Sequence, residues 1–229
     1  GWREAPYVPC PADAAALAAQ AVPVETAHGR PMWIVPGVSC DFAGAAPGRL
    51  PDVMRGEETQ IVGALAAETV TAVDAEDLAA TLGAHRIYIL PGTHSKWATV
   101  EAGRIVRFST DLTGELYAVL RAHSILGRLM PTEAGPFDDA AFARGVQVGA
   151  RGDGGLTHQL FSVRTLALAG ELAPAALPDY LSGLLIGHEV ANELRAAEAL
   201  SAAVPALIGD PALCARYARA FALLAAPTP

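Results

Sequence analysis

The chain has 229 residues, of which 52% are apolar and 17% are charged, and its formal net charge is −8. This composition predicts a globular protein with a sizeable core and excludes an intrinsically disordered chain. The acidic balance argues against nonspecific binding to nucleic acid, although a few local Arg and Lys side chains can still bind a small anion.

The cysteines and the hydropathy pattern bear on the cellular compartment. Cys10, Cys40 and Cys214 are odd in number and form no C-x-x-C pair. We therefore expect buried thiols in a reducing cytoplasm rather than a disulfide framework or a zinc site. The first residues do not form a signal peptide, and no apolar stretch is long enough to cross a membrane. The sequence predicts a cytoplasmic protein without a membrane or nucleic-acid partner.

The first part of the chain is predicted to hold short elements punctuated by Pro and Gly. Residues 1–10 and 38–51 are expected to be loops for that reason. The other predicted elements are a helix over 12–20, a strand over 32–35 and helices over 57–68 and 75–82.

Later residues give a more distinct order of elements. Strand, turn, strand, turn, strand and helix follow one another between residues 86 and 122, with Ala102-Gly103 as a hairpin turn. From residue 137 onward the chain is predicted to be mostly helical. The strands are expected at 86–90, 97–101, 104–109 and 204–208, and the helices at 113–122, 137–150, 156–170, 178–200 and 211–224.

A first candidate site is the run Arg55-Gly56-Glu57-Glu58 at the start of a predicted helix. A carboxylate there can accept a proton from a substrate hydroxyl, and Arg55 can hold an anionic group. Acidic residues also favour helix starts for structural reasons alone, because they complement the helix dipole and cap free N–H groups. Both interpretations stay open on the sequence.

A second candidate site is the polar turn formed by Gly92, Thr93, His94, Ser95 and Lys96 between two strands. Such a turn offers backbone N–H groups, hydroxyls and one ammonium to a phosphate. The spacing is not that of a Walker A loop, and an ordinary polar hairpin turn is the alternative. A zinc site at His94 is disfavoured because no second His or Cys lies at ligand spacing.

A third candidate is Gly209-Asp210, where a strand meets a helix. Glycine at such a position lets a flat ligand approach the backbone, although a plain strand-to-helix turn has the same residues.

The order of these three signals resembles the sugar-kinase branch of the actin-like ATPase superfamily. More specifically, blocks along nearly the whole chain resemble those of the 2-dehydro-3-deoxygalactonokinase family. These blocks are Pro51–Gln60, Leu90–Trp97, Thr113–Leu116, His123–Gly127 and Tyr180–Glu189.

This resemblance implies an α/β fold of the ribonuclease H-like, actin-like ATPase/sugar kinase type, with two lobes and ATP between them. Residues 1–70 would be the remainder of a sugar-acid-binding first lobe. Residues 71–229 would be the nucleotide-binding second lobe, with a β-hairpin phosphate loop and a helical region. The family's N-terminal phosphate loop has no counterpart in these residues, so we expect an incomplete first lobe and a 229-residue chain that is inactive alone.

The resemblance also implies a reaction. ATP would phosphorylate 2-dehydro-3-deoxy-D-galactonate at its terminal hydroxyl and give the 6-phosphate, in galactonate catabolism. Glu57 is the expected base, with Glu58 as the fallback, and Arg55 and Ser39 are expected to bind the sugar acid. The polar turn would hold the ATP phosphates.

The remaining expectations concern adenosine, metal and alternatives. Gly209 and Asp210 would meet adenosine, and Mg²⁺ is implied by the chemistry, with its ligands unassigned. A homo-oligomer is left open. The alternatives are a non-catalytic nucleotide-binding fragment or pseudo-kinase, and a kinase for the gluconate epimer, 2-dehydro-3-deoxygluconate.

Overall fold

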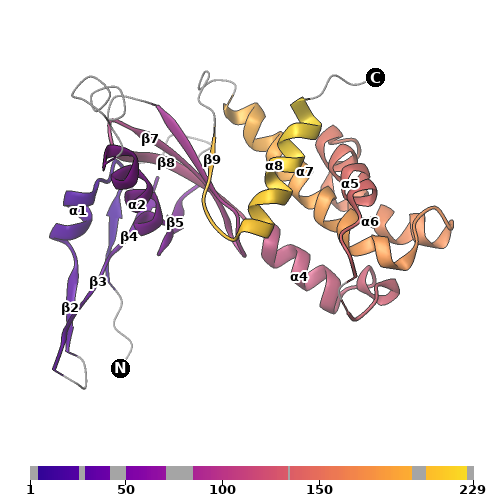
Figure 1. Ribbon diagram of the computed structural model, residues 1–229, viewed down its shortest axis with the longest axis horizontal. Helices are drawn as coiled ribbons and strands as arrows, with labels where there is room; N and C mark the ends of the chain where they lie inside the picture. The colour runs from indigo at the N-terminus through magenta and orange to yellow at the C-terminus, as the bar shows by residue number, and fades with distance from the viewer. Residues whose placement is uncertain are drawn as a thin grey trace. The chain divides into compact units, whose positions relative to one another are not determined.

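The computed structural model has a mixed α/β fold made of two compact units (Figure 1). It describes residues 5–25, 29–41, 50–70, 85–133, 135–197 and 205–225. The described residues of unit 1 fall within Gly1–Leu90, Lys96–Thr110 and Ala203–Ile208. Those of unit 2 fall within Pro91–Ser95, Asp111–Ala202 and Gly209–Pro229.

Unit 1 contains the strands that the described residues form, apart from the end residues Ser95 of β7 and Asp111 of β8, which fall in unit 2. Its sheets have the orders β1-β4-β5, β2-β3 and β8-β7-β6-β9. In the last of these, β6 is antiparallel to β7 and parallel to β9. The elements are β1 (Tyr7–Pro9), α1 (Ala14–Ala19), β2 (Val22–Glu25), β3 (Pro31–Ile34), β4 (Gly37–Cys40), β5 (Asp52–Met54), α2 (Glu57–Val70), β6 (Arg86–Leu90), β7 (Ser95–Glu101), β8 (Arg104–Asp111) and β9 (Ala206–Leu207).

Helix α2 shares one hydrophobic core with strands of two of these sheets. Ile61 of α2 is fully buried in the same cluster as Val38 of β4 and Tyr88 of β6. The Tyr88 hydroxyl donates a 2.9 Å hydrogen bond to Glu68 of α2. Helix α2 therefore packs against the sheet that contains β6 and β7, and this packing holds the first turn of α2 in place.

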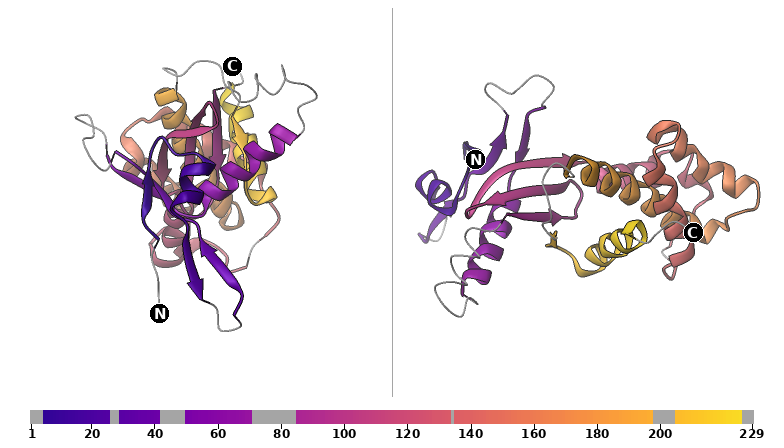
Figure 2. Two further views of the ribbon diagram at one scale, coloured as in Figure 1. Left: turned by 90° about the vertical axis from the view of Figure 1, so that its left-hand side faces the viewer. Right: turned by 90° about the horizontal axis from the view of Figure 1, so that it is seen from above.

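Unit 2 is a group of helices (Figures 1 and 2). Glycines bring the backbones of two of these helices into contact. A methyl group added at Gly149 would lie 2.0 Å from the carbonyl oxygen of Leu184, and one at Gly187 would lie 2.4 Å from that of Val146. Any larger side chain would have to push the helices apart. The elements are α4 (Thr113–His123), η1 (Gly127–Leu129), α5 (Asp139–Arg151), α6 (Gly155–Leu168), η2 (Pro174–Ala176), α7 (Leu177–Ala197) and α8 (Pro211–Ala225).

The predicted elements agree with the structure where a local signal exists. The hairpin turn is confirmed, because Ala102 and Gly103 have positive φ angles of 48° and 73° between β7 and β8, as tight hairpin turns require. The expectation of loops was wrong at two places. Residues 7–9 form β1 and residues 37–40 form β4, which pair in parallel with one another. The predicted helix over 75–82 lies outside the described residues.

The extent of unit 1 differs from that of the expected first lobe. The strands between residues 86 and 110, which the resemblance placed in the second lobe, pack in unit 1 with the residues before them. The reason is that β6 and β7 pair with each other and bury Tyr88, Leu90 and Ala98 in the core that α2 covers. The functional division into lobes stays a prediction.

Two further expectations concern the thiols and the membrane. All three cysteines are free; Cys40 is buried, and its sulfur lies 2.9 Å from that of Cys10, which directly follows β1. Among the helices of the described residues, none is both long and apolar enough to cross a membrane.

Candidate functional site

Helix α2 begins at the acidic pair that the sequence singles out. Gly56 precedes it with a φ of 108°, a conformation that favours glycine. Glu57 Oε2 accepts a 3.0 Å hydrogen bond from the backbone N–H of Arg55. Its other oxygen lies 3.4 Å from Nζ of Lys96, whose side chain is 4% exposed. Two of the predicted site residues, 39 positions apart in the sequence, are thus in contact within unit 1.

Glu58 has a different environment from its neighbour. Its side chain is buried, and it accepts hydrogen bonds from the backbone N–H of Gly56 at 2.7 Å and from the Thr59 hydroxyl at 3.3 Å. Burial raises the pKa of the Glu58 carboxyl above its ordinary value, against the lowering effect of these hydrogen bonds. Glu58 therefore serves the start of its own helix.

Arg55 and Ser39, the expected sugar-acid ligands, also lie in unit 1. An Nη2 N–H of Arg55 donates a 2.7 Å hydrogen bond to the carbonyl of Ala5, and the guanidinium lies 4.5 Å from the ring centroid of Tyr7. The Arg55 residue remains exposed. Ser39 is a buried residue of β4, paired with Val53 of β5.

The polar turn between β6 and β7 is held from outside by the start of α4. The backbone N–H of Glu115 donates a 2.8 Å hydrogen bond to the carbonyl of Thr93. A methyl group on Gly114 would lie 2.2 Å from the carbonyl oxygen of Gly92, so only glycine permits this approach. Thr93 itself is exposed. The Thr113–Leu116 block of the sequence thus has a structural role next to the turn.

His94 and Ser95 face different partners. His94 forms a hydrogen bond through Nε2 with the carboxylate of Glu115. No group of three or more metal-ligating side chains forms among the described residues. Ser95 is fully buried, and its hydroxyl donates a 2.7 Å hydrogen bond to Glu189 of α7.

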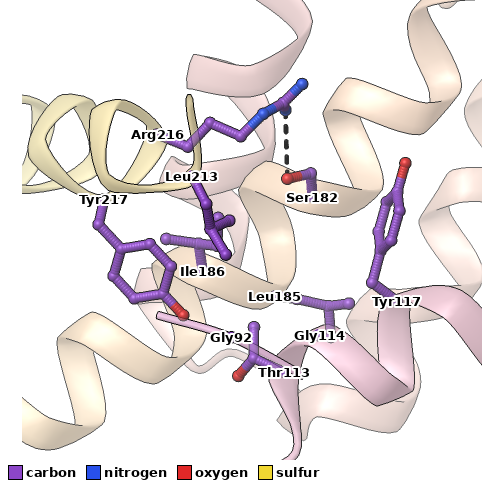
Figure 3. A pocket seen from close by; sticks show the side chains of 10 residues that line it. All are labelled: Gly92, Thr113, Gly114, Tyr117, Ser182, Leu185, Ile186, Leu213, Arg216 and Tyr217. Carbon is purple, nitrogen blue, oxygen red and sulfur yellow. Dashed lines mark hydrogen bonds between the residues drawn. The ribbon is translucent and has the colours of Figure 1, made fainter. Parts of the chain in front are cut away.

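A pocket of about 180 Å³ opens beside Gly92 within unit 2 (Figure 3). It lies between the start of α4, the middle of α7 and one face of α8, and leucine and isoleucine side chains form much of its wall. Figure 3 shows the Tyr217 hydroxyl directed toward the Gly92–Thr113 side of the pocket and Arg216 reaching to Ser182. The lining residues are Gly92, Thr113, Gly114, Tyr117, Ser182, Leu185, Ile186, Leu213, Arg216 and Tyr217.

Arg216 is fixed in place at this pocket. Its Nη2 lies 2.7 Å from Asp179, its Nη1 donates a 3.2 Å hydrogen bond to Ser182, and its guanidinium lies 4.6 Å from the ring centroid of Phe137. These contacts make it a wall of the pocket with a set orientation. Arg216 has no recognisable signal in the sequence, because only packing shows which face of α8 is turned inward.

Gly209 and Asp210, the expected adenosine contacts, precede this face of α8 and are not among the pocket's lining residues. The φ of Gly209 is 149°, and a methyl group there would lie 3.3 Å from the carbonyl oxygen of Pro91. Asp210 Oδ1 accepts a 2.9 Å hydrogen bond from the N–H of Leu213, which caps the helix.

The comparison with known proteins gives this arrangement a family. A family model described as 2-keto-3-deoxy-galactonokinase matches residues 1–228. The chain belongs to this family. A 2-dehydro-3-deoxygalactonokinase of Escherichia coli (strain K12) is 35% identical over 221 residues, which are 96% of this chain and 66% of that protein. A probable 2-dehydro-3-deoxygalactonokinase of Rhizobium meliloti (strain 1021) is 38% identical over 197 residues, 85% of this chain and 58% of that protein.

A solved structure also resembles the chain. It is a crystal structure from Sinorhizobium meliloti, provisionally named 2-dehydro-3-deoxygalactonokinase, with a TM-score of 0.80 and 34% identity. The match covers 99% of this chain and 67% of that one. The chain therefore spans about two thirds or less of the length of the curated relatives and of this structure. The family resemblance expected from the sequence blocks is confirmed.

Proposed function

We propose that the protein containing this chain transfers the γ-phosphoryl group of ATP to the terminal hydroxyl of 2-dehydro-3-deoxy-D-galactonate, giving the 6-phosphate. The observation that carries the proposal is the family match over residues 1–228, together with relatives that bear this kinase name. Phosphoryl transfer of this kind depends mainly on positioning and charge stabilisation. The chain's own residues supply both in the following roles.

Glu57 is the proposed general base. Its carboxylate is 24% exposed and is oriented by Lys96 and by the N–H of Arg55, so it is accessible and has a defined direction. It would accept the proton of the attacking hydroxyl at Oε1 or Oε2. Glu58 is buried with both oxygens engaged locally, which supports Glu57 over its neighbour.

The turn after β6 is the proposed phosphate site. Gly92 and Thr93 offer exposed or half-buried backbone, and Thr93 adds an exposed hydroxyl. Lys96 would contribute positive charge from the base of the turn, and His94 lies at its exposed side. Ser95 would act indirectly, because its hydroxyl points inward to Glu189.

The pocket beside Gly92 is the proposed site of the nucleotide base. Its volume of about 180 Å³ lies below the roughly 300–1,000 Å³ of sites that take a whole drug-sized ligand, so it suits the base alone. Gly209 and Asp210 would contribute by setting the start of α8, which carries Leu213 and Tyr217 into the pocket.

Arg55 and Ser39 are the proposed contacts of the sugar acid. Arg55 uses an Nη2 N–H for Ala5, and the remaining donors of its planar guanidinium suit a carboxylate. An Arg at this place would be oriented by Tyr7, over whose ring it lies.

The remaining parts of the proposal follow from the family's chemistry. Mg²⁺ would neutralise phosphate charge; the described residues form no group of three or more His, Cys, Asp or Glu side chains that could hold a metal ion, and we assign Mg²⁺ no protein ligand and no step. The ribonuclease H-like arrangement of two lobes belongs to this proposal. A cytoplasmic location and a homo-oligomer stay predictions from the sequence.

The test is an assay of ADP release by the full-length protein with a panel of 2-keto-3-deoxy sugar acids. We expect turnover with 2-dehydro-3-deoxy-D-galactonate and less with the gluconate epimer. The Glu57→Gln variant, purified in parallel, is the control for a contaminating kinase. Absence of ADP release with every sugar acid of the panel would overturn the proposal, and preference for the gluconate epimer would replace the substrate.

A further inference from the structure

Three buried polar side chains meet behind the proposed phosphate turn, within unit 2. Ser95, Glu189 and Tyr217 are 0%, 1% and 1% exposed. The Ser95 hydroxyl donates a 2.7 Å hydrogen bond to Glu189 Oε1, and the Tyr217 hydroxyl donates one of 2.7 Å to Glu189 Oε2. The two hydroxyls are themselves 3.3 Å apart. Each residue comes from a different element: β7, α7 and α8.

Burying a carboxylate in this way costs free energy of folding, so packing alone does not explain the arrangement. A carboxylate taken out of water loses hydration that hydrogen bonds only partly replace, and apolar residues of the same size would often stabilise the fold equally well. Glu189 has hydrogen-bond donors on both oxygens, so its position and orientation are fixed. Burial and the Glu189 carboxylate raise the pKa of Tyr217 well above its ordinary value, so the tyrosine stays a donor.

We propose that Glu189 is a positioning residue that locks the phosphate turn to the nucleotide-base pocket; this inference rests on the proposed function. Through Ser95, Glu189 fixes the chain between His94 and Lys96. Through Tyr217, it fixes a residue that lines the pocket together with Gly92. One carboxylate thus sets the spacing between the group that would bind the base and the turn that would bind the phosphates.

Neither oxygen of Glu189 needs to touch a substrate for this role. Its effect is transmitted by Ser95 and Tyr217, so loss of Glu189 should weaken binding of the nucleotide and leave binding of the sugar acid unaffected. A purely structural role would instead lower the stability of unit 2 without distinguishing between the two substrates.

The experiment compares kinetic constants of the full-length protein and two variants at Glu189. Glu189→Ala leaves two buried hydroxyls without their acceptor, and we expect kcat/KM for ATP to fall about tenfold or more. The KM for the sugar acid should stay within about twofold. In Glu189→Gln, the amide oxygen can accept a hydrogen bond from Ser95 and the amide N–H can donate one to Tyr217. This variant should therefore recover most of the kcat/KM for ATP that Glu189→Ala loses.

A matched pair of tyrosine variants separates positioning from stability. Tyr217→Phe removes one hydroxyl of the trio and keeps the ring in the pocket. Tyr180→Phe removes an equally buried hydroxyl, bonded at 2.7 Å to Ser162, in the same unit but outside the pocket. We expect only Tyr217→Phe to weaken ATP binding, and we expect thermal unfolding to show similar losses of stability in both variants.

ADP binding by isothermal titration calorimetry on the same variants keeps the test independent of turnover. If no sugar acid is phosphorylated, the proposed function fails, and ADP affinity alone then decides the role of Glu189. The inference is overturned if Glu189→Ala weakens binding of the sugar acid and of ATP equally, or if Glu189→Gln binds ATP no better than Glu189→Ala. It is also overturned if Tyr180→Phe weakens ADP binding as much as Tyr217→Phe does.

Discussion

The ammonium nitrogen of Lys96 lies 3.4 Å from a carboxylate oxygen of Glu57. The lysine is almost wholly buried, whereas the glutamate is partly exposed. Removing either partner of such a pair would leave the other without its compensating charge. The pair therefore orients the proposed base, at the start of α2, against β7 within unit 1.

Replacement of Glu57 tests the base directly. We expect Glu57→Gln in the full-length protein to lower kcat by about 10²-fold or more with little change in ATP affinity, as loss of a general base does. Steady-state kinetics and ADP calorimetry measure the two effects. Normal turnover by Glu57→Gln beside an inactive Glu58→Gln would move the role to Glu58.

Changes in the turn should separate nucleotide from sugar acid. Thr93→Ala and Lys96→Ala remove a hydroxyl and a positive charge from the proposed phosphate site, so the KM for ATP should rise by about tenfold or more. The KM for the sugar acid should change less. An equal effect on both substrates, or on neither, would mean that the residues form an ordinary polar hairpin turn.

The contact between α4 and the turn should not tolerate a methyl group. In Gly114→Ala, the new methyl would collide with the carbonyl of Gly92 at 2.2 Å, so the turn must move and ATP binding should weaken. Gly63→Ala is the matched control, because nothing lies within 4 Å of a methyl there. That change in α2 should stabilise the protein by about 0.5–1 kcal/mol. Unimpaired ATP binding by Gly114→Ala would contradict the described contact.

Glu58 should make stability depend on pH in a direction set by burial. Its pKa in the folded chain is raised above its ordinary value of 4.5. The folded state therefore binds the proton more readily than the unfolded state does. The resulting contribution to the free energy of unfolding is fully present below pH 4.5 and is lost as pH rises through the folded pKa.

Glu58→Gln removes that ionisation. Relative to the wild type, the variant should gain free energy of unfolding as pH rises from below 4.5 to neutrality. Urea unfolding at several pH values measures the difference. A pH-independent difference would show that burial does not disfavour the Glu58 charge.

The neighbouring thiols of Cys10 and Cys40 should be cross-linked by a mild oxidant. Their sulfurs are 2.9 Å apart, and the hydrogen bond with Cys10 lowers the pKa of Cys40, which favours the reactive thiolate. Diamide would take up the two hydrogens that the thiols lose. Mass spectrometry of peptides should find this disulfide, reversible by dithiothreitol, while Cys214 stays free. Mixed disulfides involving Cys214 instead would contradict the prediction.

Local signals in the sequence predict the hairpin turn and the start of α2. They fail to predict strands whose pairing partners are distant in the sequence. Ala102-Gly103 and the Glu57 helix start are readable because turn and cap chemistry act within a few residues. β4 lies in a Gly-rich stretch and is a strand only because β1 and β5 pair with it on either side.

The pocket was beyond reach for a similar reason. Gly92 was predicted as part of a ligand site, but Tyr217 and Arg216 line the pocket through tertiary packing of α8. In the sequence, Glu189 ends one of the family blocks, Tyr180–Glu189. Its burial with Ser95 emerges from the fold.

The glycine contacts between α5 and α7 divide the surface of α7 into positions with different freedom to change. Gly183 and Gly187 face backbone atoms of α5, so these positions admit no side chain. Ser182 directly precedes Gly183, and Leu185 and Ile186 lie between the two glycines, but these three residues line the pocket. Substitutions that alter the preference for one purine over another should therefore accumulate at these three positions, on a helix whose register the glycines keep constant.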